Sequence, residues 1–202
     1  MKHSPSRQPV LLVVSGPSGS GKDSVIAALR TLEPEVGYCV SATSRAPRAG
    51  EIEGVHYHFV SRDDFQRMLG AGAFIETREY AGNLYGTPKA FVEETLRSGR
   101  DLVMKPEVNG AMKIKQVYPD AVLVFLTVRS EDELVRRLEV RNADGPEDIA
   151  ARLETARVEE KAIKDYDYLI VNDEFDVAVA QLRAILRAEA LKVWRLKGSG
   201  KR

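Results

Sequence analysis

Short runs of branched apolar residues alternate along the chain with longer segments in which apolar and charged residues recur with a helical period. The continuous runs are typical of strands buried on both faces of a parallel sheet: Val10–Val14, Asp101–Met104, Ala121–Val128 and Tyr168–Val171. Helical periods lie between and after them, at Val25–Leu29, Lys89–Arg97, Glu131–Arg141, Glu147–Lys164 and Asp176–Trp194. Strands that alternate with helices predict an α/β fold with a parallel sheet.

Two regions depart from this alternation. Residues 38–88 hold several glycines and two short strand-like pieces, Tyr38–Ala42 and His56–Val60, and predict an inserted subdomain with β character. Residues 131–157 are highly charged, with arginines at intervals, and predict a mobile helical excursion. The core would then comprise residues 10–37, 89–130 and 158–194, with flexible tails at 1–9 and 195–202.

Composition narrows the class of protein. The 202 residues include 30 Lys and Arg against 30 Asp and Glu, so the formal net charge is zero. That balance argues against a broad basic face for nucleic acid, although a small anionic ligand needs only a few local cations. The single cysteine, Cys39, precludes an intrachain disulfide and fits a reducing compartment. Because no apolar run approaches the roughly 20 residues of a membrane helix and no secretory signal is evident, we expect a cytosolic protein without membrane partners.

A glycine-rich segment between the first predicted strand and helix carries the clearest chemistry. It matches the G-x-x-x-x-G-K phosphate loop and consists of Gly16, Pro17, Ser18, Gly19, Ser20, Gly21 and Lys22. Glycines let successive N–H groups turn toward phosphate oxygens, the helix adds its positive N-terminal end, and lysine supplies a point charge. The sequence therefore predicts a nucleotide phosphate site here.

The position after Lys22 departs from this motif. Ser or Thr is usual there, because its hydroxyl binds Mg²⁺, but this chain has Asp23 followed by Ser24. One hypothesis is that Asp23 contacts Mg²⁺ or its water shell, since carboxylates are good ligands for that ion. The alternative is that Asp23 only favours the helix N-terminus electrostatically.

The segment from Ser41 to Val60 resembles the GMP-binding signature of the guanylate kinase family, S-x-T-x-R-x-P-R-x-G-E-x-x-G-x-x-Y-x-F-V. Similarity continues through Phe74–Glu76, Gly82–Pro88 and Asn109–Ala111 to Val171–Asp173, and covers roughly residues 10–190. The resemblance implies a P-loop nucleoside monophosphate kinase fold and transfer of the ATP γ-phosphoryl group to GMP with Mg²⁺. In that fold, residues 38–88 would be the GMP-binding subdomain and residues 131–157 the lid.

Roles for the acceptor residues follow from this resemblance. Arg45 and Arg48 would hold the GMP phosphate with Tyr57 and Tyr85, as guanidinium forks suit phosphate oxygens. Glu76 would accept from guanine N1–H and the 2-amino group, which adenine lacks on that edge, so the site would discriminate between the bases. The resemblance places four further residues in this pocket: Ser41, Thr87, Glu51 and Glu107.

The donor side follows similarly. Resemblance puts Lys22, Arg137 and Arg152 on the transferring phosphates as catalytic residues, with Arg141 beside them. Arg137 and Arg141 share a helix face because they are four residues apart. Asn172 follows a predicted strand, at the carboxyl edge where ligands bind in open α/β sheets, and the family pattern puts it near the ATP base.

A second departure concerns Lys105, which stands where the family usually has the first acid of an acid-x-acid pair, while Glu107 keeps the second. One hypothesis couples this change to Asp23, with Lys105 facing Asp23 or a phosphate. The bland alternative is a surface lysine beside Pro106. A branch resembling the plastid type has a similar loop and a basic residue here, so activity is expected to survive.

Two rival functions remain open at this stage. Ribose 1,5-bisphosphate phosphokinases resemble the phosphate loop closely, but they would not need the guanine-reading residues. Catalytically dead guanylate kinase-like modules of scaffold proteins sit in larger chains and generally have a degraded loop. Acceptance of dGMP and the choice between monomer and homodimer are also left open. We expect a guanylate kinase of purine nucleotide metabolism.

Overall fold

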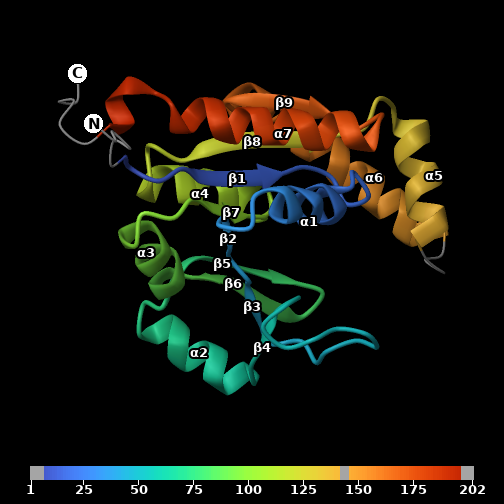
Figure 1. Cartoon of the computed structure of the whole chain (residues 1–202). Helices are drawn as coiled ribbons and strands as arrows, with labels where there is room; N and C mark the ends of the chain where they lie inside the picture. The colour runs from blue at the N-terminus through green and yellow to red at the C-terminus, as the bar shows by residue number, and fades with distance from the viewer. Residues whose placement is uncertain (1–6, 142–145, 197–202) are drawn as a thin grey trace.

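The computed structural model describes residues 7–141 and 146–196, and within these the side chains of 140–148 stay outside the description. Figure 1 shows a helix-flanked sheet above a smaller β-rich unit, with two helices projecting at one end. The core strands are β1 (Leu11–Ser15), β2 (Gly37–Tyr38), β7 (Leu102–Met104), β8 (Val122–Thr127) and β9 (Tyr168–Val171). Their order is β2-β7-β1-β8-β9 and every pairing is parallel. The apolar runs predict four of these strands, but not β2, whose Tyr38 is expected from the sequence in the inserted subdomain.

Both faces of this sheet are covered because neighbouring residues of a strand point to opposite sides. Leu12 and Val14 pack with α1 (Lys22–Leu32) and α7 (Phe175–Ala190). Leu11 and Val13 pack on the other face with α3 (Lys89–Arg97) and α4 (Val108–Val117). The first strand is therefore buried on both sides, which holds the loop that follows it on a rigid support.

The inserted subdomain contains a four-stranded sheet in the order β4-β3-β6-β5. Its elements are β3 (Ala42–Thr43), β4 (His58–Phe59), α2 (Arg62–Gly70), β5 (Phe74–Tyr80) and β6 (Asn83–Pro88). The sequence predicts β character here but not α2, β5 or β6 individually, nor α4 in the core. Helix α2 begins at a Ser61 cap whose hydroxyl accepts from the Asp64 N–H at 3.0 Å.

The charged excursion forms two helices, α5 (Glu131–Arg141) and α6 (Pro146–Glu160), which pack through Leu134, Leu138 and Ala156. Helix α6 ends four residues earlier than the periodicity predicts, and a short 3₁₀ turn follows it at Ile163–Asp165. Helix α7 likewise ends at Ala190 rather than Trp194, and a second 3₁₀ turn follows it at Val193–Arg195. None of the described helices has the length and apolar character that crossing a bilayer requires.

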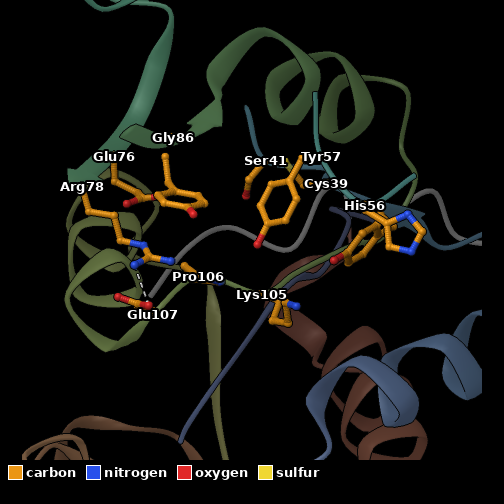
Figure 2. Close-up of a pocket in the computed structure, with 12 residues that line it drawn as sticks. Cys39, Ser41, His56, Tyr57, Glu76, Arg78, Gly86, Lys105, Pro106 and Glu107 are labelled. Carbon is orange, nitrogen blue, oxygen red and sulfur yellow. Dashed lines mark ion pairs between the residues drawn. The ribbon is translucent and has the colours of Figure 1, made fainter. Parts of the chain in front are cut away.

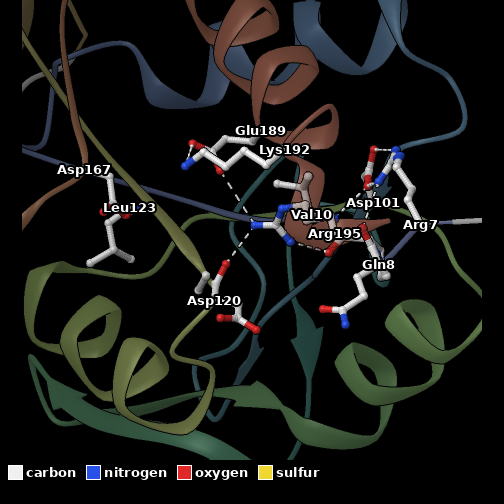
Figure 3. Close-up of polar contacts among 12 residues, drawn as sticks. Arg7, Gln8, Val10, Asp101, Asp120, Leu123, Asp167, Glu189, Lys192 and Arg195 are labelled. Carbon is white, nitrogen blue, oxygen red and sulfur yellow. Dashed lines mark hydrogen bonds and ion pairs between the residues drawn. The ribbon is translucent and has the colours of Figure 1, made fainter. Parts of the chain in front are cut away.

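The inner ends of the two predicted tails belong to the folded core, which corrects their boundaries (Figure 3). Arg7 donates two hydrogen bonds to Asp101, at 2.7 and 2.6 Å, and pairs through its backbone with Leu196. Arg195 is 1% exposed and donates to the carbonyls of Pro9 and Asp120, each at 3.0 Å. Composition does not reveal these contacts because they join residues at least 75 positions apart in the chain.

Candidate active site

The phosphate loop joins β1 to α1 and follows the shape that its glycines allow. Gly16, Gly19 and Gly21 have φ values of 136°, 88° and 94°, which other residues rarely adopt. At Gly16 a Cβ atom would also lie 2.1 Å from the Leu126 carbonyl oxygen of the neighbouring strand. A larger residue at this position would displace the loop.

Lys22 is folded back over this loop. Its Nζ donates to the carbonyls of Gly16 at 2.5 Å and Pro17 at 2.7 Å. Burial, and after it the nearby charge of Lys105, lowers the pKa of Lys22 to about 8. A phosphate group bound in the loop would favour the charged form of Lys22 and so raise its pKa again.

The loop is held from beneath by residues of two other segments. The buried Asn172 donates through Nδ2 to the Ser20 carbonyl at 2.8 Å. Arg137 donates to the Asn172 carbonyl at 2.8 Å and to Glu133 at 2.7 Å. Asn172 thus supports the loop's backbone, which the sequence does not predict; its contact with the ATP base stays a prediction.

The remaining donor-side residues lie around the mouth of the loop. Arg152 on α6 donates to the Ser18 hydroxyl at 3.1 Å and so links the predicted lid to the loop. Asp23 lines the cleft, whereas Ser24 is exposed in the first turn of α1. The side chain of Arg141 lies outside the described residues, so its predicted role has no geometry here.

On the opposite wall, Glu51 organises the two predicted phosphate-binding arginines. Arg45 donates to both Glu51 oxygens, at 2.9 and 2.8 Å, and the Arg48 backbone N–H donates to Glu51 at 2.7 Å. The Arg45 hydrogen bonds, followed by the Arg48 N–H, lower the pKa of Glu51 to about 2. Both arginines line the cleft that also contains Lys22.

Tyr57 and Tyr85 meet edge to face, with ring centroids 5.8 Å apart, and both line this cleft. The Arg45 guanidinium lies 5.6 Å from the Tyr57 ring centroid. Residues of the loop between β3 and β4, together with Tyr85 on β6, therefore form one wall of the cleft, and their guanidinium and hydroxyl groups suit a phosphate.

Glu76 lies deeper, in a pocket that continues from the cleft (Figure 2). Thr87 donates to its Oε1 at 2.5 Å, and burial raises the pKa of Glu76. Gly110 on α4 allows this approach, since a Cβ there would lie 2.9 Å from Glu76 Oε2. Ser41 also lines the pocket, so residues from three predicted motifs meet in one place.

Arg78 is a site residue that the sequence reasoning missed. It forms an ion pair with Glu107 at 2.6 Å, and its guanidinium lies 4.6 Å from the Tyr85 ring centroid. Figure 2 shows this pair at one side of the pocket, with Glu76 close by. The available signal was strand spacing, because Arg78 follows Glu76 by two residues and shares its side of β5.

Glu159 on α6 is a second residue that was missed. It lines the cleft near Lys22, and burial raises the pKa of its carboxyl to about 7. Its surroundings in sequence, Val158-Glu-Glu160, suggest only a solvated helix face. The close packing of α6 over the phosphate loop decides its position.

The two departures from the motif pattern face each other, as one of our hypotheses expects. Lys105 forms an ion pair and hydrogen bond with Asp23, although 82 residues separate them. Burial alone would lower the pKa of Lys105, but the Asp23 carboxylate outweighs it, and the pKa stays above its ordinary value. The Lys105 ammonium group thus neutralises the negative charge of Asp23.

Among the described residues, no group of three or more His, Cys, Asp or Glu side chains could hold a metal ion on its own. Nucleotide-bound Mg²⁺ does not need such a group, because it takes most ligands from phosphates and water and one or two from carboxylates. Asp23 and Glu159 both line the cleft at the loop. These hard oxygen donors fit an ion that arrives with a nucleotide.

The parallel sheet, the phosphate loop after its first strand, the inserted β-rich unit and the helical pair define a P-loop nucleoside monophosphate kinase fold. The guanylate kinase family model matches residues 8–189, so the chain belongs to this family. A guanylate kinase of Desulfitobacterium hafniense is 43% identical over 186 residues, which cover 92% of this chain and 93% of that one. A guanylate kinase of Frankia casuarinae is 47% identical over 176 residues, which cover 87% of this chain and 96% of that one.

A solved structure supports the same family assignment. The crystal structure of guanylate kinase from Anaplasma phagocytophilum superposes with a TM-score of 0.80 at 34% identity, covering 96% of this chain and 93% of that one. A gluconokinase from Sinorhizobium meliloti matches with a TM-score of 0.53 at 22% identity, which shows a shared fold only.

Proposed function

We propose that the protein transfers the γ-phosphoryl group of ATP to GMP, giving ADP and GDP, in purine nucleotide metabolism. One observation carries this proposal above the others. The pocket around Glu76 and the cleft around Lys22 share six lining residues, namely Tyr57, Arg78, Tyr85, Lys105, Pro106 and Glu107. An acceptor whose base lies in the pocket would therefore present its phosphate to the donor loop.

The expected reaction is an in-line displacement without a covalent enzyme intermediate. The acceptor phosphate is already anionic near neutral pH, so the protein needs to position and neutralise rather than to abstract a proton. Lys22, Arg137 and Arg152 would meet charge on the transferring phosphoryl group, and Arg45 and Arg48 would hold the acceptor phosphate. Asp23 would give the metal an oxygen, and Mg²⁺ bound with ATP would neutralise phosphate charge.

The helical pair at 131–157 would act as a lid. Arg152 already reaches Ser18 of the loop, and Glu159 on the same helix lines the cleft. Closure over two nucleotides would exclude water that could otherwise hydrolyse ATP. The cytosolic location, and the choice between a monomer and a homodimer, remain expectations from sequence.

The decisive assay measures ADP release with ATP and Mg²⁺ and compares acceptors: GMP, dGMP, AMP and ribose 1,5-bisphosphate. We expect GMP to be preferred over AMP, because adenine would leave the Glu76 carboxylate unpaired. A preference for ribose 1,5-bisphosphate would support the rival kinase. Folded protein without turnover on any acceptor would support the binding module, and either result would reject our proposal.

A further inference from the structure

The turn Lys105-Pro106-Glu107 lies between the two halves of the site. It follows β7 at the carboxyl edge of the core sheet, and each of its three residues lines both the Glu76 pocket and the Lys22 cleft. Its two charged residues form ion pairs with different halves of the site: Lys105 pairs with Asp23 on α1, and Glu107 pairs with Arg78 on β5. The turn therefore links the donor side to the acceptor side.

The energetics of the Lys105–Asp23 pair suggest more than a structural contact. The Lys105 side chain is 24% exposed, whereas that of Asp23 is 51% exposed. An ion pair with one such exposed partner contributes little to stability, while partial desolvation of an ammonium group has a cost of its own. Stability alone gives little reason to hold a lysine at this position.

The charges of the cleft indicate what Lys105 would meet. Lys105 lines the same cleft as the cationic side chains of Lys22, Arg45 and Arg48. Cations gathered around one space repel one another unless an anion enters it. Lys105 also lines the pocket together with Tyr57, whose ring contacts the Arg45 guanidinium (Figure 2).

We propose that Lys105 binds the phosphate of the acceptor nucleotide, and exchanges Asp23 for that phosphate when GMP enters. The acceptor is favoured over ATP because Lys105 belongs to the wall of the Glu76 pocket as well as to the cleft. The exchange would release Asp23 toward the donor side. This inference rests on the proposed function and adds a phosphate-binding residue to it.

The test compares GMP with guanosine, which has the same base and ribose but no phosphate. In Lys105→Met, GMP affinity measured by ligand-detected NMR or calorimetry should fall about 10-fold to 100-fold, the range for one charged hydrogen bond. Guanosine affinity should stay within about 2-fold, which also shows that the pocket is intact. Lys89→Met removes an exposed lysine that pairs with Glu93 on α3 and serves as the matched control.

A double variant separates phosphate binding from mere neutralisation of Asp23. If Lys105 serves only to balance Asp23, then Asp23→Asn combined with Lys105→Met should restore GMP affinity. We expect no restoration, because the missing contact is to the ligand. Restoration would overturn the inference, as would an equal loss for guanosine and GMP or a loss confined to a non-hydrolysable ATP analogue. Wild-type protein that binds neither GMP nor guanosine would instead reject the proposed function itself.

Discussion

The donor loop and the acceptor pocket bind related groups but are constructed differently. The loop is one contiguous segment, residues 16–22, and its shape depends on backbone conformation, as the positive φ values of Gly16, Gly19 and Gly21 show. The acceptor pocket depends on side chains from separate elements, among them Arg45, Glu76 and Glu107. A local motif can therefore specify the first site, while the second exists only after distant segments pack.

The largest expected effect concerns Lys22, the charged side chain of the donor loop itself. Lys22→Met should lower kcat about 10²-fold to 10³-fold, because fixed charge on the transferring phosphoryl group is lost. Folding stability should be unchanged or higher, since a buried ammonium is replaced by an apolar side chain. Steady-state kinetics and urea unfolding check this, with Lys89→Met as the control. A loss below 10-fold would show that the loop's backbone suffices.

A smaller effect is expected in the acceptor pocket, because several side chains share the recognition of GMP there. Glu76→Gln should raise the KM for GMP about 10-fold to 100-fold, because one charged hydrogen-bond acceptor becomes a neutral amide. Discrimination against AMP should narrow at the same time. Glu79→Gln is the matched control, because Glu79 lies on the same strand but is more than half exposed beside Arg62. If the preference for GMP over AMP were unchanged, other residues of the pocket would have to recognise the base.

Gly110→Ala tests the pocket through packing rather than chemistry. The added Cβ would lie 2.9 Å from Glu76 Oε2, so the carboxylate must move by a few tenths of an ångström. A loss of about 1 kcal/mol, or roughly 5-fold in the KM for GMP, is expected, with kcat little changed. Gly70→Ala on α2, where a Cβ has open space, is the control. Equal kinetics for both variants would mean that the Glu76 position tolerates displacement.

The smallest effect concerns Glu159 and depends on pH. Burial raises its pKa from 4.5 to about 7, so the folded protein binds this proton more tightly than the unfolded chain. Stability from this group is present below about pH 4.5 and is lost as pH rises to about 7. Without nucleotide, Glu159→Gln should therefore gain a few degrees of Tm over wild type between pH 5 and pH 8. A constant difference would contradict this, and Glu154→Gln on the exposed side of α6 is the control.

Much of the core and the donor loop could be predicted because their signals are local. The runs at Val10–Val14 and Tyr168–Val171 become parallel strands, and α3 and α5 have the predicted bounds. Helix α4 was not predicted, because Asn109 and Gly110 weaken its helical signal and its inward face shows only once it packs on the sheet. Strand β5 was missed too, and with it the position of Arg78 beside Glu76.

The sequence by itself determined the phosphate loop, the residues of the acceptor signature and the unusual charges at Asp23 and Lys105. Periodicity and motif spacing act over a few residues, so they survive in the one-dimensional pattern. Only the tertiary structure decided that Asp23 meets Lys105, that Arg78 holds Glu107 and that Glu159 enters the cleft. The two ion pairs join residues that are 29 and 82 positions apart in the chain. Coulomb attraction has no sequence specificity, so the packing of the fold decides which charges become neighbours.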